Sequence, residues 1–102
     1  MPRYVLMSRL SGEGAQTVHK NPDRMLAVNK EIEAFGCRVE AQYALIGDVD
    51  FISIVEAPDN ETIAHLSIDL ASRGTVKITT YPALDVGALI KRLKSPHKLG
   101  HA

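Results

Sequence analysis

The stretch from Cys37 to Glu56, CRVEAQYALIGDVDFISIVE, predicts a β-hairpin at the centre of the fold. Its first half places an apolar side chain at every second position: Cys37, Val39, Ala41, Tyr43 and Leu45. Such alternation is typical of a strand, which we expect over residues 37–46. Gly47 and Asp48 supply turn chemistry, and residues 50–56 return as a second strand.

A two-residue turn also predicts which residues of the hairpin lie opposite each other: Leu45 and Asp50, Tyr43 and Ile52, Ala41 and Ile54. Cross-strand partners share one face of a sheet. This face is almost wholly apolar, so we expect it to lie beneath helices. The other face is then uncovered, and we assign to it these residues of the hairpin and the outer strands: Glu40, Gln42, Ala44, Phe51, Ser53, Val55, Val5, Met7, Thr79 and Tyr81.

A helix is predicted on each side of the hairpin. The first begins at Asn21-Pro22, carries an apolar stripe and ends at Gly36. The second begins at Pro58-Asp59 and ends at Gly74. The two stripes repeat at helical spacing: Met25, Val28, Ile32 and Phe35 in the first, and Ile63, Leu66 and Leu70 in the second.

The outer segments complete a βαββαβ order. Residues 3–10 and 75–81 are predicted as strands, the second ending at Pro82. A helical turn is expected over 15–20 and a short last helix over 85–94. This order is the split βαβ pattern, so we predict an α+β ferredoxin-like sandwich, with a four-stranded antiparallel sheet and helices on one face.

Length and charge narrow the class of protein. The chain has 102 residues, and we expect one domain over 1–94 with a mobile tail over 95–102. Twelve basic residues balance twelve acidic ones, which argues against nucleic-acid and membrane partners. A single cysteine, Cys37, and no signal-peptide pattern predict a cytoplasmic protein.

Motifs for metals and nucleotides are incomplete. His97 and His101 have metal-ligand spacing, but Pro96 and Gly100 argue against a helix that would align them. Gly12-Glu13-Gly14 follows a strand, yet the third glycine of a dinucleotide-binding loop is missing. We therefore predict no metal site and no cofactor.

Several short motifs together resemble the GYD domain family: Tyr4, Leu6, Gly14, Asn21-Pro22-Asp23-Arg24, Gly36-Cys37, Tyr43, Gly47, Asp50, Val55-Glu56-Ala57-Pro58-Asp59, Gly74 and Ala83-Leu84. The resemblance extends to about residue 92. It implies a dimeric α+β barrel, a group that includes small monooxygenases, isomerases and ligand-sensing modules. The eponymous Gly-x-Tyr-Asp segment is Gly47-Asp48-Val49-Asp50 here, so the tyrosine is absent.

Two functions stay open at this point. The first is a dimeric module that binds a small molecule or acts as a structural or regulatory partner. The second is a cofactor-independent monooxygenase- or isomerase-like enzyme for a small phenolic or cyclic substrate, with Asp50 and His65 as catalytic base and proton shuttle. Ligand-binding candidates are residue types with a flat ring or a fixed charge: Tyr4, Tyr43, Tyr81, Arg9 and also Arg73.

The uncovered sheet face predicts a homodimer. A large exposed apolar patch is unusual for a soluble monomer. Two such faces packed about 10 Å apart would cover each other in a twofold dimer. We expect the contact to involve these residues: Phe51, Ser53, Val55, Gln42 and Ala44.

Overall fold

The computed structural model describes residues 1–96, so His97, His101 and most of the predicted tail lie outside it. The elements in chain order are β1 (Arg3–Leu10), α1 (Gly12–Lys20), α2 (Arg24–Ala34), β2 (Arg38–Ala44), β3 (Phe51–Glu56), α3 (Asn60–Ala71), β4 (Val76–Ala83) and α4 (Val86–Leu93). Every strand and helix expected from the sequence is present.

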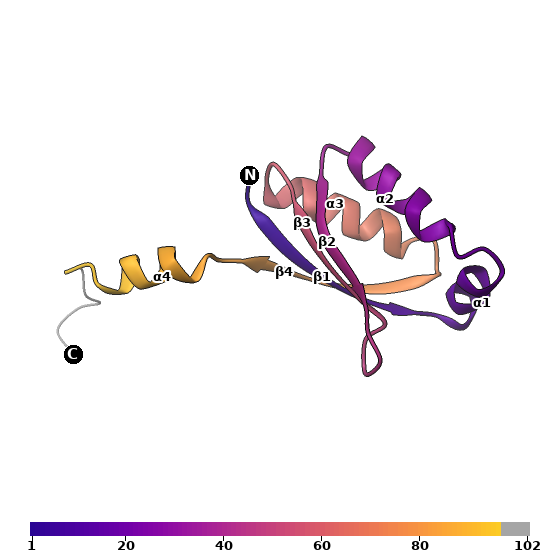
Figure 1. The fold of residues 1–102 in the computed structure, drawn as a ribbon. Coiled ribbons are helices and arrows are strands. Elements are labelled where there is room, and N and C mark those ends of the chain that lie inside the picture. The colour runs from indigo at the N-terminus through magenta and orange to yellow at the C-terminus, as the bar shows by residue number, and fades with distance from the viewer. Residues whose placement is uncertain (97–102) are drawn as a thin grey trace.

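The strands form one antiparallel sheet in the order β2-β3-β1-β4. Helices α2 and α3 cover one face of it, whereas α4 extends away from the sheet beyond the end of β4 (Figure 1). The fold is therefore α+β and consistent with the ferredoxin-like prediction.

Local chemistry explains where the helices begin and end. The Asp59 carboxylate accepts hydrogen bonds from the backbone N–H (2.8 Å) and the hydroxyl (2.6 Å) of Thr62 at the start of α3, and these bonds lower the pKa of Asp59. Gly36 and Gly74 follow α2 and α3 with φ of 89° and 75°. This left-handed backbone favours glycine and stops a helix.

Several boundaries differ from those predicted, including the end of β2 at Ala44 rather than at residue 46. Helix α1 begins at Gly12, capped by the Ser11 hydroxyl, and is longer than the expected turn. Helix α2 begins at Arg24, because Asn21 and Pro22 belong to the preceding turn. Strand β4 continues through Pro82 to Ala83. It is an edge strand, where a missing backbone N–H costs no hydrogen bond between strands.

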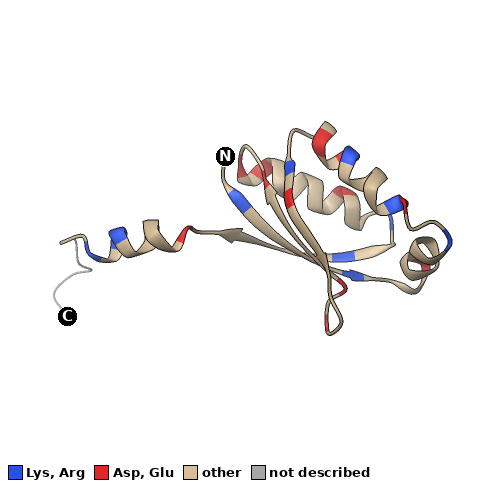
Figure 2. Cartoon of the chain, viewed as in Figure 1, with Lys and Arg blue, Asp and Glu red and all other residues tan. Residues whose placement is uncertain are grey.

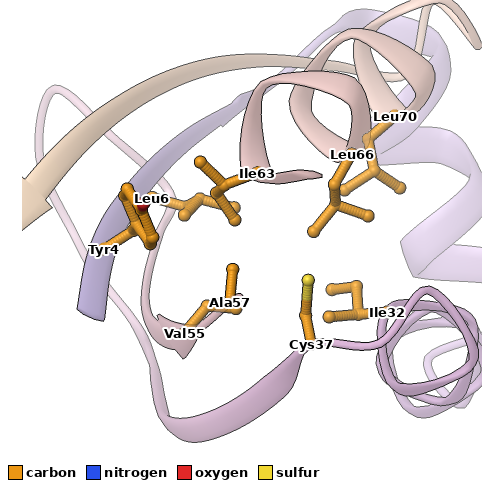
Figure 3. Packing of buried hydrophobic residues seen from close by; sticks show 9 residues of the cluster. All are labelled: Tyr4, Leu6, Ile32, Cys37, Val55, Ala57, Ile63, Leu66 and Leu70. Atoms are coloured by element: carbon orange, nitrogen blue, oxygen red, sulfur yellow. The ribbon is translucent and has the colours of Figure 1, made fainter. Parts of the chain in front are cut away.

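The core lies between α3, the end of α2 and the helix-facing side of the central strands (Figure 3). As predicted, it contains the apolar stripe of α3 and Cys37, and burial raises the pKa of that thiol. The buried apolar cluster consists of Tyr4, Leu6, Ile32, Cys37, Val55, Ala57, Ile63, Leu66 and Leu70.

The hairpin register is as predicted, but the face assignment of the hairpin is wrong. Tyr43 pairs with Ile52 and Ala41 with Ile54, as expected. However, Ser53 and Val55 are buried beneath the helices. Five hairpin residues assigned to the uncovered face therefore lie on the helix side: Phe51, Ser53 and Val55 of β3 with Gln42 and Ala44 of β2.

A β-bulge explains the error. The register shifts between Val39 and Ala41, so Glu40 is an extra residue in β2. Val39 pairs with the buried Val55, whereas Ala41 pairs with Ile54. One inserted residue turns every following side chain to the opposite face. The apolar positions before the bulge thus enter the core, and those after it point away from the helices.

Candidate interaction surface

The sheet face opposite the helices, which we call the open face, carries an apolar centre. Side chains alternate along a strand, so the neighbours of the buried Tyr4, Leu6, Ser53 and Val55 point to this side. Two rows of paired residues cross all four strands: Ala41, Ile54, Val5 and Tyr81 in one, and Tyr43, Ile52, Met7 and Thr79 in the other. The assignment of Val5, Met7, Thr79 and Tyr81 to this face agrees with the pairing.

Charged residues border the open face at the strand ends. The next row of the sheet joins Arg38, Glu56 and Arg3. Arg38 lies 3.2 Å from Glu56, and Arg3 Nε donates to the Glu40 carboxylate at 2.6 Å. Figure 2 shows charged residues of both signs on the helices, turns and strand ends. An apolar centre with a polar rim is the usual composition of a protein–protein interface.

Helix α4 provides a second uncovered apolar surface. Val86, Leu89, Ile90 and Leu93 follow the i, i+3, i+4, i+7 spacing of one helix face. Every residue from 84 to 94 is exposed, including Val86 at 68% and Leu93 at 74%. Asp85 caps the helix by accepting from the Ala88 N–H at 2.9 Å.

The overall dimensions reflect this extension. The radius of gyration is 16.7 Å, compared with about 13 Å for a compact domain of this length. Figure 1 shows α4 beyond the end of the sheet rather than against it. The apolar side of α4 is therefore available to another chain. The helix was predicted from the sequence, and its stripe is visible there as helical spacing, but only the structure shows that it lies away from the core.

The predicted catalytic residues lie apart. The Asp50 carboxylate accepts from the Leu10 N–H at 2.8 Å, and the Asp50 N–H donates to the Ser8 carbonyl at 2.8 Å. His65 is exposed on α3, where its ring packs edge-to-face against Phe35 at 4.7 Å between centroids. Asp50 lies just before the first residue of β3. Phe35 lies just before the first residue of β2, which pairs with the last residue of β3. The two predicted catalytic residues are therefore near opposite ends of β3. The catalytic roles of Asp50 and His65 stay predictions.

The predicted ligand-binding residues occupy three separate environments. Tyr43 and Tyr81 lie on the open face, one on each edge strand. Tyr4 belongs to the core, its hydroxyl bonds to the Asn60 side-chain oxygen, and burial is the main cause that raises its pKa. Arg9 is exposed, and its Nε donates to a carbonyl of the hairpin loop at 2.8 Å. The structure thus places only the two tyrosines on one shared face, at its opposite edges, and does not bring the candidates together.

Among residues 1–96 no cluster of three or more metal-ligating side chains occurs, and no helix is long and apolar enough to cross a membrane.

These features define a class: a small α+β protein with helices on one side of its sheet and an apolar open face on the other. More particularly, the GYD domain family model matches residues 4–92, and the chain belongs to that family. A curated relative from Thermus thermophilus is 50% identical over 95 residues, which are 92% of this chain and 100% of the relative. That relative is named "Glutamine synthetase and cystathionine beta-lyase binding protein". No solved structure matches the chain.

Proposed function

We propose that this protein is a homodimeric, non-catalytic regulatory module that binds other proteins through α4. The observation that carries the proposal is the apolar stripe of α4, which is exposed along its whole length and held away from the core. An amphipathic helix with i, i+3, i+4 and i+7 anchors is a common peptide-like element that inserts into an apolar groove of a partner.

The partners that we propose are the two enzymes named for the relative, a glutamine synthetase and a cystathionine β-lyase. The support is the 50% identity, which covers the whole length of that relative. The polar side of α4 carries Lys91 and Arg92. A groove with apolar pockets and an acidic margin would match both the stripe and these cations.

The open face is the proposed dimer interface. Ile52, Ile54, Val5 and Met7 form its centre, on the two central strands. A twofold axis through this centre would place each copy against an identical apolar surface. Since α4 extends beyond the sheet, dimer formation and partner binding would use different residues, and their loss can be measured separately. We also propose a cytoplasmic location, which the single, buried Cys37 supports.

Partner binding is tested with Leu89→Lys and the control Ala88→Lys. Leu89 lies within the stripe, whereas the adjacent Ala88 projects from the other side of the helix. Affinity for each purified enzyme from the same organism is measured by biolayer interferometry. We expect Leu89→Lys to weaken binding at least tenfold and Ala88→Lys to change it less than threefold. Equal losses, or no binding of either enzyme by the wild type, would refute the proposal.

Dimer formation is tested with Ile52→Lys and the control Ala27→Lys. Ile52 is central to the open face, whereas Ala27 is exposed on α2 on the other side of the sheet. Phe51 is not suitable for this test, because it lies beneath the helices. Sedimentation equilibrium should show a dimeric wild type and Ala27→Lys but a monomeric Ile52→Lys. A monomeric wild type would show that the open face does not self-associate.

A further inference from the structure

The helix side of the sheet contains a cavity of about 280 Å³ that is separate from both proposed interaction surfaces. It lies between α1, α2 and the sheet, with the end of α3 at one side. Its walls are mainly apolar, and they include Leu10, Val18, Met25, Val28 and Phe51. None of these five is fully buried, although all five belong to helices or strands.

The size of the cavity is sufficient for a small ring compound. Protein interiors contain few voids larger than one water molecule. An apolar cavity of about 150 Å³ is enough to bind benzene. Ligand pockets begin at roughly 300 Å³. The volume here therefore suits a single ring or a branched chain with one polar group.

The charged side chains that line the cavity indicate which polar group a ligand would carry. The only charged side chains that line the cavity, among the described residues, are Arg24 at the start of α2 and Arg73 just after α3. Both are partly exposed, so they mark where the cavity meets solvent. Two guanidinium groups beside an apolar interior form a site for a carboxylate, because the planar fork of arginine matches its two oxygens.

One acidic residue sits between the arginines without neutralising both. Glu31 forms an ion pair with Arg73 and lies 3.5 Å from Arg24. The hydrogen bond from Arg73 lowers the pKa of Glu31, so it is ionised at neutral pH. Arg24 is further from this carboxylate than the roughly 2.7–2.9 Å of a close charge-assisted bond, and it retains donors for a second anion. Asp69, 3.9 Å from Arg73, is half-exposed and does not line the cavity.

Three of the six uncharged polar side chains that line the cavity bond to one another. Asn29 Nδ2 donates to Gln42 Oε1 at 2.9 Å, and Gln42 Nε2 donates to Ser53 Oγ at 3.1 Å. Asn29 Oδ1 is a buried acceptor without a partner in the described part of the chain. The bonded groups therefore require little of a ligand and the interior favours an apolar body, whereas Asn29 Oδ1 is left as an acceptor for a hydrogen-bond donor.

We infer that this cavity binds a small monocarboxylic acid with an apolar, ring-sized body, its carboxylate at Arg24 and Arg73 and its body against Met25, Val28 and Phe51. The site goes beyond the proposed function, because neither the open face nor α4 contributes to it. A ligand held there would bridge α2 and the end of α3.

Phenylacetate, acetate and 2-phenylethanol are suitable probes, since the last two each keep only one half of the first. Dissociation constants are measured by isothermal titration calorimetry. We expect saturable binding of phenylacetate and at least tenfold weaker binding of acetate and of 2-phenylethanol. No saturable binding of phenylacetate, or equal binding of the alcohol, would overturn the inference.

Arg24→Gln and Lys30→Gln form a matched pair, because both remove one positive charge from α2 but only Arg24 lines the cavity. Thermal unfolding establishes that both variants are folded. Arg24→Gln should weaken phenylacetate binding at least tenfold, and Lys30→Gln less than twofold. In amide NMR spectra the probe should shift the signals of Met25, Val28 and Phe51. Equal effects of the two variants, or shifts confined to α4 or the open face, would contradict the assignment.

Discussion

The replacement Gly14→Ala tests how closely α1 packs against the sheet. Gly14 is buried in α1, and a Cβ atom built on it would lie 2.0 Å from the carbonyl oxygen of Thr75 and 2.9 Å from the carbonyl carbon. The first distance is about 1 Å short of even the closest separation that real Cβ atoms show. Because the obstructing atoms belong to the backbone, no side-chain rotation relieves the overlap.

The same carbonyl already anchors the start of α1. The Ser11 N–H donates to Thr75 O at 2.9 Å, and the Ser11 hydroxyl donates to the Gly74 carbonyl at 2.8 Å. Moving α1 outward to accommodate a methyl group would stretch both bonds. Overpacking costs about 1–3 kcal/mol, and a strained hydrogen bond adds about 0.5–1.5 kcal/mol. The higher helix propensity of alanine offsets about 0.5–1 kcal/mol of this destabilisation. We expect a net loss of about 0.5–4 kcal/mol.

Gly12→Ala is the control in the same helix, since a Cβ atom there meets nothing within 4 Å. Its free energy of unfolding should change by no more than about 0.5 kcal/mol. Urea unfolding followed by circular dichroism, at one fixed protein concentration, compares the two variants with the wild type. If Gly14→Ala is as stable as Gly12→Ala, α1 does not pack against Thr75 as described here.

Three further variants test the core, the hairpin and the ion pair between the helices. Leu66→Ala should lower the free energy of unfolding by about 2–5 kcal/mol, because Leu66 is fully buried in the core; a urea titration that shows under 1 kcal/mol would contradict this packing. Asp50→Asn should cost about 0.5–2 kcal/mol in the same assay, since the amide oxygen still accepts from Leu10, and an effect on ligand binding or turnover without one on stability would instead make Asp50 a site residue. Glu31→Gln should destabilise the protein at pH 7, because the hydrogen bond from Arg73 lowers the pKa of Glu31 in the folded state. This difference from the wild type should persist above the unfolded pKa of about 4.3 and vanish as the pH falls through the lower folded value; a pH-independent difference in urea midpoints would show that the charge is not responsible.

Much of the fold follows from local sequence signals. Gly36 and Gly74 end helices in the left-handed conformation, and Asp59 caps α3, each at the position that the sequence predicts. The pairing of Tyr43 with Ile52 also follows from the turn of the hairpin. These features depend on a few neighbouring residues, so the sequence alone determines them.

Only the tertiary structure decides which side of the hairpin is covered. Alternation shows that β2 has two faces, but the bulge at Glu40 exchanges them partway along the strand, and no turn residue in the sequence marks it. Gln42 and Ser53 can lie under the helices because they bond to each other, and Gln42 also accepts from Asn29 of α2, a partner distant in sequence. The more apolar side is thereby left on the open face.

The candidate sites depend on tertiary structure for the same reason. The sequence indicates Arg73 as a possible anion-binding residue and α4 as a helix, but neither signal is sufficient. Arg24 and Arg73 meet at one cavity only because α2 and the end of α3 pack side by side, with Glu31 between them. Likewise, the stripe of α4 has the pattern of a core-facing helix, and the path of β4 is what carries it away from the core. Periodicity determines that a surface is apolar, whereas the positions of other elements determine whether they cover it.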